Sequence, residues 1–209
     1  MTMNEAKMKS ALASDNLTII NDRLLAKSAV LVPLIKTDSG EWIVLFQVRA
    51  SHLKRQPGEV CFPGGTLDGP EESPRQAARR ETCEELGLRP EEIYIWGQLG
   101  LIISPFNLLL FSFVGEIPPA ERLNPNANEV AAVFTVPLAR LFSLKPETYP
   151  VYVKASPAVD FPFDKIPGGR DYPWRTGVVQ EVFYELDGRI IWGLTARILQ
   201  HFLTLVRNT

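Results

Sequence analysis

A single long helix between two groups of apolar runs constrains the fold of this 209-residue chain most. Residues 73–86 contain no glycine, and their only proline, Pro74, suits the first helical position. Ser73 is a favourable N-cap, and Gly87 supplies a helix stop. The apolar runs before and after this segment have the length of strands, so the helix must pack on a sheet.

The helix is predicted to carry an acidic face. Residues three and four apart lie on the same side of a helix, so Glu81, Glu84 and Glu85 project together. Three close carboxylates repel one another unless a cation lies among them, and Mg²⁺ or Mn²⁺ suits oxygen ligands. The alternative is a solvated acidic face with Arg80 in an ordinary ion pair. The Phe-Pro-Gly-Gly run at residues 62–65 favours the metal site, because a double glycine lets the backbone approach a ligand closely.

Apolar patterning and turn signals predict the remaining elements. The expected strands are 29–36, 42–49, 60–62, 93–104, 108–117, 129–136, 178–186 and 189–192. A short helix is expected from 137 and an amphipathic helix over 193–206, and the Pro- and Gly-rich residues 151–174 have no assignment. The apolar stripe of the last helix is predicted to be core: Leu194, Ile198, Leu199, Phe202 and Leu205. These elements predict an α+β fold, an α/β/α sandwich around a mixed sheet, over residues 28–209, with residues 1–27 as a flexible lead-in.

Composition limits the classes of function. Hydrophobic residues make up 45% and charged residues 22%, as in ordinary globular domains, and the net charge of −2 gives no basic field for nucleic acid. No apolar run is long enough for a membrane span, and the N-terminus lacks a signal-peptide core. Cys61 and Cys83 are expected to be reduced thiols of a cytoplasmic protein, and His and Cys are too few for a zinc site.

Residues 65–88 resemble the Nudix box, G-x5-E-x7-R-E-U-x-E-E-x-G-U, in which U is aliphatic. Between Gly65 and Arg80 there is one residue more than the pattern has, and Thr82 replaces the aliphatic residue. The early box glutamate is either Glu71 or Glu72. The resemblance implies a mixed sheet between helices and an enzyme that hydrolyses a nucleoside diphosphate linked to another group.

A second resemblance concerns residues 45–65, which are similar to the coenzyme A pyrophosphatase signature, L-L-T-x-R-[SA]-x3-R-x3-G-x3-F-P-G-G. The candidate substrate-binding residues are Arg49, Lys54, Arg55, Gly58 and Phe62. Lys54 replaces the arginine of the signature. A lysine ammonium offers a point charge, whereas an arginine guanidinium can donate two parallel hydrogen bonds to a phosphate. The sequence therefore favours Arg55 as the contact for the 3′-phosphate of coenzyme A. The alternative is that Lys54 and Arg55 only solubilise a loop.

Residues 191–199 are also similar to a late segment of the same enzymes, and they are interpreted as core. The resemblance implies a coenzyme A-like small molecule as substrate, with 3′,5′-ADP and 4′-phosphopantetheine as products. ADP-ribose and dinucleoside polyphosphates are alternative substrates, and a non-catalytic nucleotide-binding module is the alternative of another class. No nucleic-acid or membrane partner is expected, and the oligomeric state is open, with a homodimer as one option.

The resemblance also implies roles for individual residues. Glu81 and Glu85 are expected to be direct metal ligands, with Glu84 beside them and a backbone carbonyl from Gly64 or Gly65. Arg80 is expected to hold the carboxylates in place. Glu129, at the head of a strand, is the candidate general base, and the alternative is an ordinary surface glutamate.

Overall fold

The computed structural model describes residues 19–20 and 22–207 of the chain. Along the chain, the elements are a 3₁₀ turn η1 (Asp22–Leu24), β1 (Ala26–Lys36), β2 (Trp42–Arg49), β3 (Val60–Cys61), β4 (Gly64–Thr66), α2 (Pro74–Leu86), η2 (Pro90–Glu92), β5 (Tyr94–Ser104), β6 (Leu108–Glu116), η3 (Ala120–Arg122), β7 (Val130–Pro137), α3 (Leu138–Ser143), β8 (Glu147–Lys154), η4 (Phe163–Lys165), η5 (Gly169–Asp171), β9 (Thr176–Leu186), β10 (Arg189–Trp192) and α4 (Gly193–Arg207).

A mixed seven-stranded sheet forms the body of the molecule, in the order β3-β2-β1-β6-β5, with β4 also paired to β1 and β7 to β2. β1 is buried along most of its length and runs parallel to β6, whereas its pairings with β2 and β4 are antiparallel. The near-continuous apolar sequence of β1 follows from this position, because both of its faces are covered.

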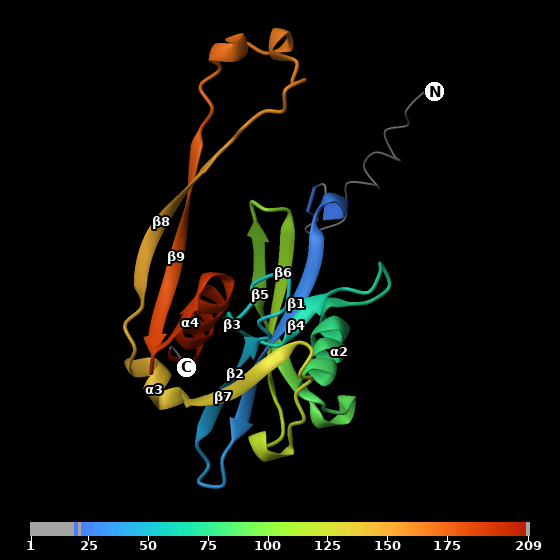
Figure 1. Ribbon diagram of the computed structural model, residues 1–209, viewed down its shortest axis with the longest axis vertical. Helices are drawn as coiled ribbons and strands as arrows, with labels where there is room; N and C mark the ends of the chain where they lie inside the picture. Colours follow the sequence, from blue (N-terminus) through green and yellow to red (C-terminus); the bar gives the residue numbers. More distant parts are fainter. Residues whose placement is uncertain (1–18, 21, 208–209) are drawn as a thin grey trace, which may run out of the picture.

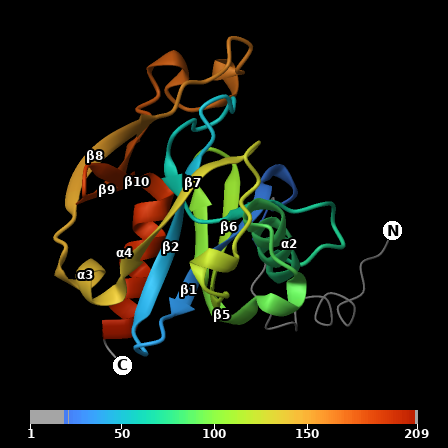
Figure 2. The same ribbon diagram turned by 60° about the horizontal axis from the view of Figure 1, so that its bottom comes forward.

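Two helices cover the two faces of this sheet (Figures 1 and 2). On one face, Ala77, Ala78 and Leu86 of α2 pack in a core with apolar residues of β1, β2 and β6. On the other face, Ile198 and Phe202 of α4 pack in a second core that also takes in β9 and β10. The predicted α+β sandwich is therefore confirmed, and α2 is held against β1 and against β4, which contains both glycines of the loop.

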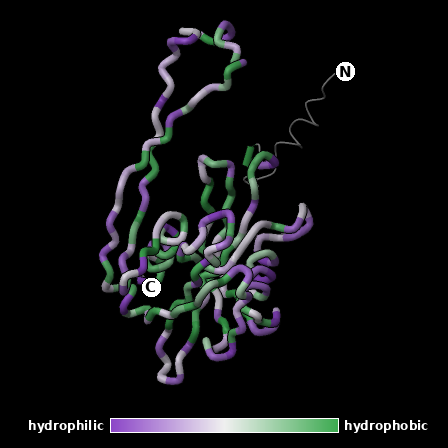
Figure 3. Tube along the Cα trace, in the orientation of Figure 1, coloured by the Kyte–Doolittle hydropathy of each residue, from purple (hydrophilic) through white to green (hydrophobic). Residues whose placement is uncertain are grey.

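Outside α4 lies a second sheet with the order β10-β9-β8. The sequence predicted the strands β9 and β10, but it predicted neither β8 nor a sheet separate from the main one. β8 and β9 continue past the body as a two-stranded arm, which Figure 1 shows in orange. Figure 3 shows hydrophobic and hydrophilic residues mixed along the arm. The unassigned residues 151–174 form the outer part of β8 and the tip, where η4 and η5 lie and where Phe161, Phe163 and Trp174 pack together.

Two further expectations need adjustment. Leu205 is 44% exposed and Leu203 takes its place in the core, because Leu203 follows the buried Leu199 by four residues and so lies on the same face of α4. β1 begins at Ala26, so the sheet begins within the expected lead-in 1–27, most of which lies outside the described residues. Among the described residues, no helix has the length and apolarity that a membrane crossing requires.

Candidate functional site

The glycine loop packs directly against α2 and β1. The backbone N–H of Gly64 donates a hydrogen bond to Glu85 Oε2 at 2.9 Å, and Gly64 has φ 153°. A Cβ atom at Gly64 would overlap the carbonyl oxygen of Ala29, and one at Gly65 would overlap the carboxyl group of Glu81. Only glycine therefore fits at position 64, where backbone atoms are in the way, whereas a side chain at position 65 would displace the Glu81 carboxyl group.

Both ends of α2 are capped as predicted. Ser73 Oγ accepts a hydrogen bond from the Gln76 N–H at 3.3 Å, and Gln76 Oε1 accepts one from the Ser73 N–H at 2.9 Å. At the other end, Gly87 adopts a left-handed conformation with φ 67° and donates to Cys83 O. These caps fix the rotation of the helix, and with it the direction of its three glutamates.

The three glutamates of α2 differ strongly in exposure. Glu85 is only 2% exposed, so it does not belong to a solvated acidic face: its carboxyl group points at the glycine loop. Glu81 is half-buried, whereas the side chain of Glu84 is 55% exposed. Because successive residues of a helix are turned by about 100°, Glu84 diverges from Glu85 although the two are adjacent.

Burial changes the acidity of the two inner carboxyl groups. The pKa of Glu85 is raised to about 7, first by burial, while the hydrogen bond from Gly64 opposes the rise and the charge of Glu81 adds to it. The pKa of Glu81 is also raised, chiefly by burial, although Arg80 opposes the rise. Two desolvated carboxyl groups whose charges repel form a place where a cation is favourable.

Arg80 connects the helix to the preceding loop. Its guanidinium makes two hydrogen bonds to Glu72, at 2.9 and 3.1 Å, and a third to Glu81 Oε1 at 2.9 Å. It also donates to Thr66 O at 3.0 Å and reaches Glu84 at 3.4 Å. These contacts place Glu72 in the position expected of the early box glutamate; Glu71 is exposed.

Glu129 reaches the acidic helix although it is distant in sequence. The loop before β7 is tied to the end of α2, because the Asn126 N–H donates to Glu85 O at 2.9 Å. The Asn126 side chain also donates to Glu129 Oε1 at 3.3 Å. The charge of Glu129 contributes to the raised pKa of both Glu81 and Glu85, so the candidate base lies within electrostatic range of the inner carboxyl groups.

The residues present fit a hard divalent cation by their chemistry. Within the described part of the chain, no three Asp, Glu, His or Cys side chains lie close enough to enclose a metal ion, and Glu81 is turned toward Arg80. The inner carboxyl groups nevertheless offer oxygen donors only, and a cation would offset the burial and the mutual repulsion that raise their pKa values. The Gly65 backbone lies against the Glu81 carboxyl group, where a carbonyl ligand is expected.

The upstream candidates have different surroundings. Arg49 is half-buried and lines two cavities beside the glycine loop, whereas Lys54 and Arg55 are exposed. Gly58 has φ 73°, which suits a tight turn. Phe62 is 3% exposed and its ring stacks on Phe46 at 5.0 Å between centroids, so it belongs mainly to the core.

An inner cavity of about 200 Å³ borders the glycine loop, and the late segment reaches it. Its lining includes Gly64, Gly65, Arg49 and Cys61, with Leu194 and Thr195 from the start of α4. Ile191, Ala196 and Leu199 of this segment are core, as interpreted, and the first turn of α4 also faces the cavity. Burial raises the pKa of the Cys61 thiol to about 11.

One polar residue at the site escaped the sequence analysis. Gln47 is fully buried in β2, its Nε2 lies 3.6 Å from Cys61 Sγ, and it lowers the pKa of Glu85 as a hydrogen-bond donor. Its Oε1 has no hydrogen-bond partner in the described structure. A glutamine inside the otherwise apolar run of residues 42–48 was the signal that could have found it. Buried polar groups usually have a hydrogen-bond partner, so a glutamine in a buried strand indicates a polar neighbour.

Comparison with known proteins yields consistent matches. The family model described as "NUDIX domain" matches residues 25–158. The chain is 33% identical over 174 residues to a protein named "Uncharacterized Nudix hydrolase NudL" from Enterobacter sp., and the match covers 83% of the chain and 79% of that protein. It is 39% identical over 123 residues to the mouse protein named "Peroxisomal coenzyme A diphosphatase NUDT7", a match that covers 59% of the chain and 51% of that protein. The chain thus spans about half the length of the mouse relative.

Among solved structures, a protein described as a MutT/nudix family protein from Enterococcus faecalis has a TM-score of 0.52. Its sequence is 16% identical, and the match covers 98% of this chain and 70% of that one. At this identity the likeness concerns the fold alone, and it agrees with the mixed sheet between helices.

Proposed function

Because the chain belongs to the Nudix family, we propose that it is a metal-dependent hydrolase that cleaves the diphosphate of coenzyme A or its derivatives. The products are 3′,5′-ADP and 4′-phosphopantetheine, or the acyl derivative of the latter. The observation that carries the proposal is the pair of buried carboxyl groups, Glu81 and Glu85, held against the glycine loop and next to a cavity lined by Arg49. The similarity to a coenzyme A diphosphatase supports the choice of substrate.

The residues of α2 and the glycine loop hold the cation in this proposal. Glu81 and Glu85 are the direct ligands, with Glu84 and the Gly65 carbonyl completing the protein's share. A divalent cation in such a site neutralises charge on the diphosphate and lowers the pKa of water. Arg80 fixes Glu72 and Glu81 by the hydrogen bonds described above, so that the carboxyl groups keep their positions between turnovers.

Glu129 and Arg49 act on the reacting molecules. Hydrolysis joins a water oxygen to one phosphorus and breaks the bond from that phosphorus to the bridging oxygen. Glu129 accepts the proton that the attacking water loses, because it lies beside Glu81 and Glu85 and is held by Asn126. Arg49 binds a phosphate oxygen of the substrate from the wall of the cavity.

A substrate panel tests the proposal. Purified protein is assayed with Mg²⁺ or Mn²⁺ on coenzyme A, dephospho-coenzyme A, ADP-ribose and a dinucleoside polyphosphate, and the products are identified by mass spectrometry. We expect coenzyme A to have the highest kcat/KM and to yield 3′,5′-ADP. A higher kcat/KM for ADP-ribose would refute the coenzyme A assignment, and nucleotide binding without turnover of any substrate would indicate a binding module.

A further inference from the structure

The inner cavity opens into a larger cleft that leads away from the glycine loop. An outer cavity of about 260 Å³ shares five lining residues with it: Arg49, Gln56, Cys61, Leu194 and Thr195. The outer cavity reaches Arg197 on α4. It meets a groove of about 520 Å³ between α4, β9 and the β5–β6 turn. A ligand bound at the glycine loop can therefore extend as far as Arg197.

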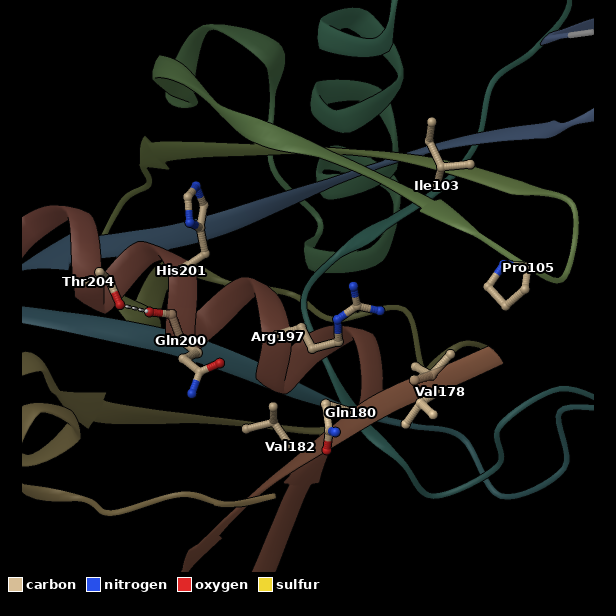
Figure 4. Close-up of a pocket in the computed structure, with 10 residues that line it drawn as sticks. Ile103, Pro105, Val178, Gln180, Val182, Arg197, Gln200, His201 and Thr204 are labelled. Atoms are coloured by element: carbon tan, nitrogen blue, oxygen red, sulfur yellow. Dashed lines mark hydrogen bonds between the residues drawn. The ribbon is translucent and has the colours of Figure 1, made fainter. Parts of the chain in front are cut away.

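Arg197 lies where the outer cavity and the groove meet, because it lines both. Figure 4 shows its side chain leaving α4 toward the space between Pro105, after β5, and Val178 of β9. Among the described residues that line the groove, Arg197 alone carries a permanent charge. His201, one turn further along α4, is already hydrogen-bonded to Leu99 O at 3.1 Å.

The guanidinium of Arg197 has no partner within the described part of the chain. The side chain is half-buried, yet it makes neither a hydrogen bond nor an ion pair there. By contrast, Arg80 has four carboxylate partners. None of its nitrogen atoms is a buried donor, so the guanidinium stays accessible and is free to bind an anion that arrives with the ligand.

Arg49 supports the same explanation from the opposite wall. Its Nε donates only to the Arg55 backbone oxygen, at 3.4 Å, and it has no carboxylate partner among the described residues. Two arginines without carboxylate partners thus face one cleft, one near the glycine loop and one further out. This spacing suits a ligand with two separate anionic groups.

The outer cavity also has two acidic lining residues, and no ion pair joins either of them to Arg49 or Arg197 in the described structure. Glu59 accepts a hydrogen bond from Gln56 Nε2 at 3.1 Å. Glu181 of β9 also lines the cavity, but its Oε2 is buried and makes no hydrogen bond in the described structure. A ligand with a hydroxyl or amino group beside its anion would suit this cavity. The anion would bind Arg197, and the hydroxyl or amino group would donate a hydrogen bond to Glu181.

We propose that Arg197 is a specificity-determining residue that binds a phosphate monoester of the substrate, remote from the diphosphate. The proposal rests on the proposed function, in which the diphosphate lies at the glycine loop and Arg49. The group has the chemistry of a ribose 3′-phosphate with its neighbouring 2′-hydroxyl. Arg197 thereby takes the role that the sequence favoured for Arg55, whose side chain is exposed and lines none of these cavities.

The test compares coenzyme A with dephospho-coenzyme A, which lacks only this phosphate. The wild type should prefer coenzyme A by roughly ten- to a hundredfold in kcat/KM, the usual worth of a charged hydrogen bond. Arg197→Gln should abolish the preference and leave turnover of dephospho-coenzyme A unchanged. Arg197→Lys should keep part of the preference for coenzyme A, because lysine keeps the positive charge but cannot donate the two parallel hydrogen bonds of a guanidinium. Arg175→Gln, an exposed position before β9, is the charge-matched control and should behave as the wild type.

A binding measurement separates this inference from the proposed function. Calorimetry on the metal-free protein compares 3′,5′-ADP with 5′-AMP, and thermal melts confirm that each variant is folded. Tighter binding of 3′,5′-ADP by the wild type and equal binding by Arg197→Gln would support the inference even if no substrate is hydrolysed. Hydrolysis of coenzyme A with an undiminished preference in Arg197→Gln would overturn the inference and leave the proposed function intact. Equal binding of the two nucleotides by the wild type would also overturn it.

Discussion

Glu85 combines almost complete burial with a carboxyl group, and this makes the folded protein sensitive to pH. An unfolded glutamate titrates near pH 4.3, whereas the pKa of Glu85 in the folded protein is raised to about 7 by burial. Between these values the folded state keeps a proton that the unfolded state has lost. The stability that this proton contributes is present at low pH and is lost as the pH rises through about 7.

Metal-free protein should therefore melt at a lower temperature as the pH rises from about 5 to about 8. Glu85→Gln should flatten this dependence, since the amide keeps an acceptor for the Gly64 N–H but does not ionise. The raised pKa of Glu81 leaves some slope. The measurement is the melting temperature in excess chelator. The exposed Glu121→Gln should retain the wild-type slope, and a wild-type melting temperature that rises across this range would contradict the account.

Glu129 provides a second test at the level of single residues. If it is the general base, Glu129→Gln should lower kcat by roughly 10²–10⁴ with little change in KM. The amide can still hydrogen-bond to Asn126, so the loop should keep its shape. Steady-state kinetics on coenzyme A measure both constants. A loss below about fivefold would assign the proton to another acceptor.

At the level of secondary structure, α2 depends on its capping box. Ser73→Ala removes the acceptor for the Gln76 N–H and should cost about 1 kcal/mol of stability, measured by urea unfolding. The caps hold the helix from outside the site, so kcat should change little. Pro74→Ala, at the neighbouring first position of the helix, should cost less. A fall in kcat far beyond the stability loss would mean that Ser73 acts on the reaction itself.

The helices and most strands could be predicted because their signals are local. Ser73, Pro74 and Gly87 mark α2, and Asp187-Gly188 marks the β9–β10 hairpin. β8 could not be predicted, because Pro150 within its run usually argues against a strand. The structure tolerates Pro150 because β8 lies at the edge of its sheet, where a missing backbone donor is harmless.

At the scale of the whole molecule, the site joins segments that no local pattern relates. The sequence predicted the acidic helix, the glycine loop and Glu129. It did not predict that Glu85 is buried, because three glutamates on one helix look alike until the helix packs on β1 and its loop. Nor did it place Arg197 at the far end of the cleft, because that depends on how α4 and β9 pack outside the sheet.

The most direct test of the central claim is the rate of coenzyme A hydrolysis with and without a divalent cation, in the wild type and in Glu85→Gln. With Mg²⁺ or Mn²⁺ the wild type should release 3′,5′-ADP and 4′-phosphopantetheine, and excess chelator should abolish the reaction. Glu85→Gln should remain folded and lose about 10²-fold or more in kcat, whereas Glu121→Gln should match the wild type. Full activity in chelator, or unchanged turnover in Glu85→Gln, would contradict a metal-dependent reaction at the acidic helix.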